Sequence, residues 1–209
     1  LYPLLEEIEK LNQKYSGTEL ELRSAIRHDI ILDQKKLFRK IMQFVSRLKI
    51  APENLSDAVL KHMNKSNAQA FKDFLLEYEK VNKEQGTHKN LVPYFVVAHP
   101  GSTMQDVQET KQFCKKLMQI TKDKPKIIDA DAIKLLSLME INNAIITPHA
   151  VELQLLLQNS NITHINKIKN KLLKAKAIQP HLKTNILLAK GPTDFIISKT
   201  KIIKVKGGN

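Results

Sequence analysis

Apolar residues follow two different periods along the chain, and the change from one to the other marks the expected elements. Leu4, Ile8 and Leu11 recur at helical spacing, whereas residues 91–98 form an unbroken apolar run of strand length. Asp33 and Ser56 stand where helix caps are expected. The sequence predicts helices near residues 4–14, 33–44, 57–64, 67–84, 103–117, 130–139, 151–157 and 165–178, and strands at 20–26, 47–51, 91–98, 126–129, 144–147, 186–189, 195–198 and 201–205.

This alternation of strands and helices predicts the fold class, which is α/β with mostly parallel strand pairing. The last two strands are expected to form a β-hairpin around Lys199-Thr200. A length of 209 residues corresponds to between one and two domains of ~150 residues. No internal repeat is visible, and residues 119–125 are the most linker-like segment in the middle.

Composition removes several classes of protein. The 42% of hydrophobic residues is enough for a buried core. A single cysteine excludes an internal disulfide, a zinc knuckle and an iron–sulfur cluster held by this chain alone, and we expect Cys114 to be a buried or inert thiol on a helix. No apolar run reaches the ~20 residues of a membrane span, and no signal-peptide pattern opens the sequence. We therefore expect a cytoplasmic protein without a membrane partner, and the first residue, Leu1, indicates a fragment.

The net charge of +13 is carried mainly by the second half of the chain. Residues 1–104 hold 16 basic and 13 acidic groups, and residues 105–209 hold 18 and 8. Thirty of the 34 basic residues are lysine and there is no tryptophan, whereas nucleic-acid readers favour arginine and stacking aromatics. The charge thus favours attraction to polyanions in general, and a nucleic-acid partner is not expected.

Polar residues follow the expected strands of the first half, at the end of a parallel sheet where ligands bind. They are His28-Asp29, Lys49, Pro52-Glu53 and His99-Pro100-Gly101. On their chemistry alone, they are either ordinary rim charges and strand stops or part of a binding site.

The runs LRSAIRHDIIL, LKIAPENLSDAVLKHMNKSN and LVPYFVVAHPGSTMQDV, in this order, resemble the YgiQ-type radical SAM family over residues 1–117. The resemblance implies a partial (β/α) barrel whose strand ends help to surround S-adenosylmethionine. The CxxxCxxC motif that holds the family's [4Fe–4S] cluster does not occur in this sequence, so this half is not expected to cleave S-adenosylmethionine by itself. By position, the S-adenosylmethionine site would include Arg23, Arg27, Lys49, Pro52, Glu53, His99, Pro100 and Gly101.

Three groups in the second half also follow expected strands. Asp129 and Asp131 lie at the start of a helix. Their carboxylates either cap that helix or face a ligand at the edge of the sheet. His149 follows the next strand and is either structural or a hydrogen-bond partner for a substrate. Lys190-Gly191 follows a third strand, where a lysine can meet a phosphate and glycine allows close approach of the backbone.

The segments KPKIIDADAIKLL, NAIITPHAVELQLLL, ILLAKGPTDFIIS and KVKGGN are similar to NAD(P)H-hydrate dehydratases, which are lyases of the ribokinase-like fold. The similarity covers about residues 120–209 and implies a truncated domain that uses ADP or ATP. Val151 stands where the family's TPH-x-GE pattern has glycine. The chain has only six glycines, and the family's glycine-rich loops do not occur in this sequence. By position, Asp129, Asp131 and His149 would lie at the hydrated nicotinamide nucleotide, and Lys190, Gly191, Pro192, Thr193 and Asp194 at the adenine nucleotide.

The two resemblances predict a fusion or fragment with a radical SAM-like part at residues 1–117 and a dehydratase-like part at 118–209. We expect neither part to be active alone, because the catalytic motifs of both families are missing. The expected partners are small-molecule nucleotides, and no metal site is expected. The alternative is a noncatalytic basic α/β module that binds nucleotides or polyanions. The sequence leaves the origin of the junction and the oligomeric state open.

Overall fold

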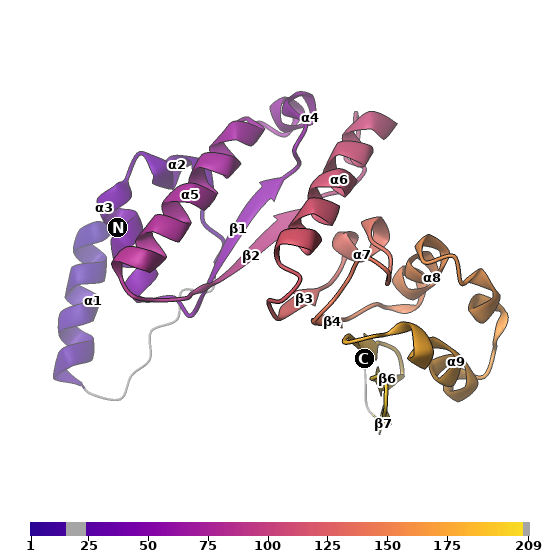
Figure 1. Cartoon of the computed structure of the whole chain (residues 1–209). Coiled ribbons are helices and arrows are strands. Elements are labelled where there is room, and N and C mark those ends of the chain that lie inside the picture. The colour runs from indigo at the N-terminus through magenta and orange to yellow at the C-terminus, as the bar shows by residue number, and fades with distance from the viewer. Residues whose placement is uncertain (16–23, 207–209) are drawn as a thin grey trace. The chain divides into compact units, whose positions relative to one another are not determined.

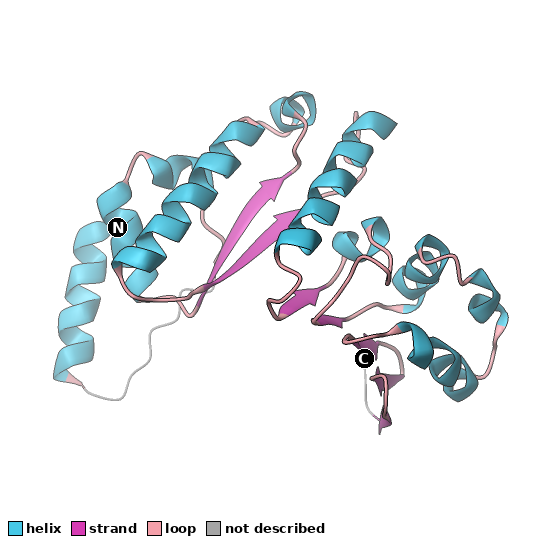
Figure 2. Cartoon of the chain, viewed as in Figure 1, coloured by secondary structure: helices cyan, strands magenta, loops and turns pink. Residues whose placement is uncertain are grey.

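The computed structural model describes residues 1–15 and 24–206 (Figure 1). It divides into two compact units, Leu1–Asp106 (unit 1) and Val107–Asn209 (unit 2). Helices and strands alternate in both, and the strands form two separate sheets with parallel pairing in each (Figure 2). The chain is therefore an α/β protein. Within the described ranges, no helix combines the length and apolarity that crossing a membrane requires.

Unit 1 is built on two parallel strands, β1 (Arg47–Glu53) and β2 (Asn90–Phe95). The chain passes from one to the other through α4 (Asp57–His62) and α5 (Ala68–Glu84). Ser56 and Asn67 begin these helices, because the Ser56 hydroxyl accepts from Val59 N and the Asn67 side chain accepts from Ala70 N. The unit also contains α1 (Tyr2–Lys14), α2 (His28–Leu32) and α3 (Lys35–Gln43), and α6 (Met104–Ile120) begins near its end.

The core of unit 1 lies between these helices and the two strands. Phe38 and Phe74 are fully buried with ring centroids 5.5 Å apart, and Leu48 and Ile50 of β1 are also buried. The isolated parallel bridge from Ile26 to Ile50 adds a short extended segment next to β1. Because β1 and β2 are parallel, their carboxyl ends lie at the same edge of the sheet.

Unit 2 contains a five-stranded sheet in sequence order, from β3 to β7. The first three strands are parallel and the last two are antiparallel, as expected for the hairpin. The strands are β3 (Lys126–Ile128), β4 (Ala144–Ile146), β5 (Ile186–Ala189), β6 (Thr193–Ile197) and β7 (Ile202–Lys206). The helices are α7 (Asp131–Leu135), α8 (Ala150–Asn159) and α9 (Lys171–Ile178), with short 3-10 helices η1 (Thr163–Lys167) and η2 (Gln179–His181).

The two faces of this sheet differ in burial. Ile128, Ile146 and Leu187 lie on one face and are buried. On the opposite face, Ile127, Ile145 and Ile186 are direct neighbours across β3, β4 and β5, and they are 73%, 41% and 38% exposed. We call these three residues the isoleucine row.

Several predicted boundaries differ from the structure. Asp33 ends α2 and does not cap α3, whose N-cap is Gln34. Strand β1 continues through Pro52 to Glu53, because its pairing with β2 shifts register between Ile50 and Glu53 and proline is tolerated at such an irregularity. The predicted helix 130–139 ends at Leu135, and the predicted helix 165–178 is divided by the cap at Asn170. Most of the predicted strand 20–26 lies outside the described residues, and the predicted domain limit at residue 117 falls within α6.

Candidate functional site

The parallel strands of unit 2 bring polar side chains from three separate segments to their carboxyl ends. Asp129 follows β3, Thr147 and His149 follow β4, and Lys190 follows β5. Lys190 Nζ lies 2.9 Å from Asp129 Oδ1, and the Lys190 backbone N–H donates to Pro148 O at 2.9 Å. We call Asp129, Thr147, His149 and Lys190 the unit 2 edge.

Asp129 is held in its charged form at this edge. Burial raises its pKa, but hydrogen bonds from Thr147 and Lys190 outweigh that effect and leave the pKa below its ordinary value. The next residue, Ala130, has φ of 52°, a backbone conformation that costs a non-glycine residue energy and often accompanies functional sites. Asp131 then begins α7 and forms an ion pair with Lys134, so the two carboxylates have different partners.

His149 performs the structural role that the sequence left open. Its Nδ1 accepts from Val151 N at 3.2 Å and from Glu152 N at 3.4 Å, and Glu152 Oε2 accepts from His149 N in return. This reciprocal capping box begins α8. Nε2 lies 3.2 Å from Glu152 Oε1, so both ring nitrogens have protein partners. Contact with a substrate would therefore replace one of these interactions.

The turn after β5 is organised by its own side chains. Gly191 N donates to Asp194 Oδ1 at 2.8 Å, which ties the turn to the first residues of β6. Pro192 lies exposed at its tip. The predicted adenine-nucleotide residues 190–194 thus form one compact turn beside Asp129. Thr147, which completes the pairing of Asp129, was not among the predicted residues, although it immediately precedes Pro148-His149.

The carboxyl ends of β1 and β2 form a second candidate site in unit 1. Glu53 has φ of 67°, and its carboxylate pairs with Lys65 at 3.2 Å. Val96 N donates to Glu53 O. Asn54 Nδ2 donates to Val96 O at 3.2 Å, which ties the two strand ends together. We call Glu53, Asn54, His99 and Ser102 the unit 1 edge.

Polar atoms are buried at this edge without partners. Among the described residues, His99 Nδ1 and Ser102 Oγ are inaccessible to solvent and make no hydrogen bond. Between them, Gly101 has φ of 92° and Pro100 is exposed. Buried polar groups are nearly always hydrogen-bonded, so unsatisfied ones point to a polar ligand or an ordered water. Ser102 and Asn54 were missed in the sequence, because a lone serine or asparagine in a turn carries no distinctive signal.

Other residues predicted for this site have partners within the chain or lie outside the described residues. Arg27 makes two hydrogen bonds to Asp29, which hold the pKa of that carboxyl well below its usual range. His28 is buried against Phe71 and Phe74, and burial lowers its pKa. Lys49 lies within β1 and its carbonyl accepts from Ile26 N. Arg23 lies outside the described residues.

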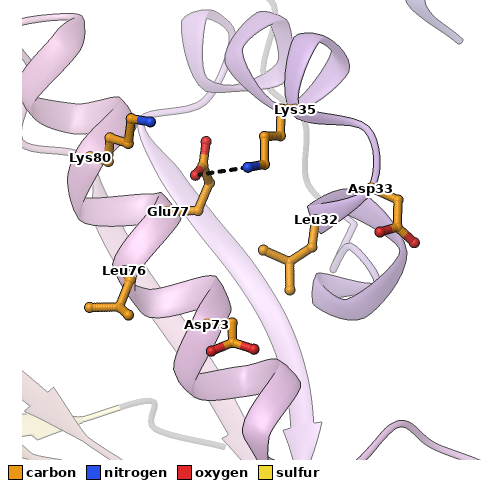
Figure 3. Close-up of a pocket in the computed structure, with 7 residues that line it drawn as sticks. All are labelled: Leu32, Asp33, Lys35, Asp73, Leu76, Glu77 and Lys80. Carbon is orange, nitrogen blue, oxygen red and sulfur yellow. Dashed lines mark ion pairs between the residues drawn. The ribbon is translucent and has the colours of Figure 1, made fainter.

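A shallow depression of about 480 Å³ opens elsewhere in unit 1, between α2, α3 and α5 (Figure 3). Asp33, Lys35, Asp73, Glu77 and Lys80 provide mixed charge around Leu32 and Leu76, and Lys35 pairs with Glu77 at 4.0 Å. The depression contains none of the predicted site residues.

The donor atoms of this chain do not fit an iron–sulfur cluster. Cys114 is its single cysteine, it is buried in α6, and burial raises the pKa of its thiol to about 11. A [4Fe–4S] cluster is held by several thiolates. In the described part of the chain, no group of three or more His, Cys, Asp or Glu residues is placed to hold a metal ion.

Comparison with curated proteins gives relatives of one kind for the N-terminal half. UPF0313 proteins of Porphyromonas gingivalis and Methanocella arvoryzae are 32% and 33% identical over 127 and 117 residues, and each match covers 55% of this chain. A UPF0313 protein of Clostridium botulinum is 34% identical over 114 residues. The chain spans about a fifth of the length of these relatives.

Solved structures give only distant neighbours. A ribokinase-like superfamily protein of Enterococcus faecalis has a TM-score of 0.39 at 12% identity, and covers 87% of this chain and 59% of its own. A hypothetical protein of Streptococcus mutans has a TM-score of 0.33 at 17% identity, and covers 64% of this chain and 52% of its own. These similarities are too low to support an argument.

The family assignment comes from a model described as NAD(P)H-hydrate dehydratase, which matches residues 55–209. The match begins inside unit 1, ahead of residue 120 where the resemblance in sequence starts, and it includes the whole unit 2 edge. Together with the UPF0313 relatives, this match indicates that the chain combines segments similar to two families. The alternative of an unrelated basic module is therefore not favoured. The match covers about three quarters of the sequence, and the chain therefore belongs to the NAD(P)H-hydrate dehydratase family.

Proposed function

We propose that unit 2 binds an adenine nucleotide, ADP or ATP, at the unit 2 edge, as a segment of a nucleotide-dependent hydrate dehydratase. The observation that carries the proposal is the convergence of Asp129, His149 and Lys190 from three parallel strand ends, with Lys190 Nζ 2.9 Å from Asp129 Oδ1. Ligands of open α/β sheets bind at the carboxyl ends of the strands. The family membership of residues 55–209 supports the same site.

Each group has a role that its environment supports. Lys190 would exchange part of its interaction with Asp129 for a nucleotide phosphate, and the turn at Gly191 would bring the backbone close to that phosphate. Asp129, Asp131 and His149 would contact the hydrated nicotinamide nucleotide. His149 would have to exchange a bond of the capping box for the substrate.

We further propose that the chain binds nucleotide without carrying out efficient dehydration. Val151 stands at the start of α8 where the family has glycine, so a side chain occupies a position of close backbone approach. The sequence has six glycines in all, which leaves few positions where the backbone can come close to a leaving hydroxyl without a side chain in between.

Thermal unfolding with and without 5 mM ADP or ATP tests nucleotide binding. A ligand that binds only the folded state stabilises it, and a dissociation constant of about 0.5 mM would give about 1.4 kcal/mol, or several degrees. Lys190→Gln should remove most of the shift. Lys176→Gln on the exposed side of α9 removes the same charge and should preserve it. No shift in the unaltered chain, or an equal shift in both variants, would contradict the proposal.

A second candidate function has an observation of its own. We propose that the unit 1 edge binds S-adenosylmethionine, as part of a radical SAM-like segment. The buried, unpartnered His99 Nδ1 and Ser102 Oγ support a polar ligand, and residues 1–117 resemble the YgiQ-type radical SAM family. S-Adenosylmethionine offers amino, carboxylate and hydroxyl groups that can hydrogen-bond to such atoms. With a single cysteine in the chain, we derive no cleavage step.

Chemical-shift mapping with S-adenosylmethionine tests this second site. We expect changes at His99, Ser102 and Lys49, and we expect them to disappear in His99→Leu. The matched variant His88→Leu alters an exposed histidine of the same unit and should keep them. Unchanged spectra at millimolar ligand would rule out binding at this edge.

A further inference from the structure

A second lysine lies against the turn that we assign to the nucleotide. A Cβ placed on Gly191 would be 3.7 Å from Lys171 Nζ and 3.6 Å from Thr193 O. Lys171 is the first residue of α9, nineteen positions before Lys190 in the sequence, and no motif singled it out. The fold alone brings its ammonium group to Gly191.

The two lysines differ in how much of their charge is available to an anion. Lys190 is paired with Asp129 at 2.9 Å. Lys171 is exposed, and among the described residues its ammonium group makes no recorded hydrogen bond or ion pair. An anion that approaches Gly191 would therefore meet an uncompensated positive charge at Lys171 and a partly compensated one at Lys190.

Two backbone amide groups in the first turn of α9 are not open to an anion. Asn170 Oδ1 accepts from Leu172 N at 3.0 Å and from Leu173 N at 3.1 Å, so these amide groups are already satisfied. The same cap determines where α9 begins and thereby places Lys171 next to the turn. The positive charge beside Gly191 thus comes from the Lys171 side chain.

We propose that Lys171 is a phosphate-binding residue of the unit 2 edge and that it makes the site prefer nucleotides with more phosphate charge. The proposal rests on nucleotide binding at this edge. Gly191 leaves the space between the turn and the Lys171 ammonium group open. The contacts of an added Cβ, at 3.6 and 3.7 Å, are ordinary, so the fold itself does not require glycine there.

The test is a series of ligands with increasing numbers of phosphates, here called the ladder, whose affinities are measured by isothermal titration at fixed ionic strength on the full chain. Adenosine, AMP, ADP and ATP are titrated into the unaltered protein, Lys171→Gln and Lys176→Gln. Lys176 lies on the same helix, is exposed, and provides the control for general charge loss. We expect affinity to rise along the ladder in the unaltered chain. Lys171→Gln should weaken ATP by about tenfold, the order of one charge-assisted hydrogen bond, and leave adenosine unchanged.

The outcomes separate this inference from the function on which it rests. If the unaltered chain binds no member of the ladder, the proposed function fails and this inference fails with it. If the chain binds nucleotides but Lys171→Gln matches Lys176→Gln, the function stands and Lys171 has no special role. Gly191→Ala provides an independent check: it should weaken ATP while thermal stability without ligand stays within about 1 °C, and unchanged ATP affinity would count against the open space being used.

Discussion

At the unit 1 edge two polar atoms are buried without partners, whereas at the unit 2 edge the polar side chains are largely exposed and Asp129 and Lys190 are bonded to one another. His99 Nδ1 and Ser102 Oγ make no hydrogen bond, but Asp129 and Lys190 form a 2.9 Å pair. A ligand at the first edge would satisfy groups that are already desolvated. A ligand at the second must break a pair that already exists, so its binding should depend more on charge and on salt.

Each unit nevertheless has a buried asparagine that bonds to backbone groups at strand ends, Asn54 at the carboxyl ends of β1 and β2 and Asn185 at the amino ends of β4 and β5. In unit 1, Asn54 donates to Val96 O and accepts from Leu55 N and Ser56 N. In unit 2, Asn185 Oδ1 accepts from Ala144 N at 3.1 Å and its Nδ2 donates to Ile141 O at 2.8 Å. Each side chain thus replaces backbone pairing at a strand end.

The largest expected effect breaks this support in one unit at a time. Asn54→Ala and Asn185→Ala each leave buried backbone groups without partners, which should lower the free energy of unfolding of the affected unit by about 3 kcal/mol. Hydrogen exchange resolved along the chain measures each unit separately. We expect Asn54→Ala to reduce protection in unit 1 alone and Asn185→Ala in unit 2 alone. Loss of protection in both units from either variant would show that they fold as one, and exposed Gln158→Ala should leave both unchanged.

A pH dependence should distinguish unit 1 from unit 2. Burial lowers the pKa of His28 from 6.5, so the unfolded chain takes up a proton at a pH where folded His28 stays neutral. The stability of unit 1 should be complete above about pH 6.5 and should fall as the pH decreases toward the folded pKa, by at most about 1.4 kcal/mol per pH unit.

Urea unfolding between pH 7.5 and pH 5 checks this slope. His28→Leu keeps an apolar side chain against Phe71 and Phe74 and should flatten the dependence, and exposed His88→Leu should retain it. Asp29 does not interfere, because its lowered pKa places its own loss of stability at much lower pH. A slope that survives His28→Leu would assign the effect to another group.

The smallest effect concerns strain that both edges share. Ala98 has φ of 63° after β2, and Ala130 has φ of 52° after β3. Glycine adopts such angles without steric cost but loses more entropy on folding, so Ala98→Gly and Ala130→Gly should each raise stability by a net ~0.5–1 kcal/mol. Ala58→Gly, in the ordinary geometry of α4, should lower it by about 1 kcal/mol. Denaturant midpoints measure these changes in stability. A lower stability in Ala98→Gly or Ala130→Gly would mean that these alanines are not strained.

Local signals in the sequence were sufficient for most elements. Ser56 and Asn67 are standard caps, and α4 and α5 begin beside them as predicted. The hairpin around Lys199-Thr200 was also predicted correctly, because two alternating apolar segments flank a short polar turn. The prediction of Asp33 as a cap was wrong because the five-residue α2 is too short to give a helical pattern of its own in the sequence. Asp33 ends that helix.

The candidate sites could be predicted only as far as strand ends could be located. Asp129, His149 and Lys190 were all placed after strands, and three parallel strands bring them to one edge. The sequence could not show that Asp129 and Lys190 would pair, since 61 positions separate them. Lys171 and Asn54 depend on tertiary contacts alone, and neither has a neighbouring motif that would identify it.

The isoleucine row has a practical consequence for the protein in solution. Ile127, Ile145 and Ile186 offer a flat apolar strip that identical molecules could share, and the net charge of +13 opposes their approach. Raising the salt concentration shortens the range of that repulsion to about 8 Å at physiological ionic strength and does not weaken apolar attraction. The protein should therefore self-associate more as the salt concentration increases, and Ile145→Lys should keep the molecules apart.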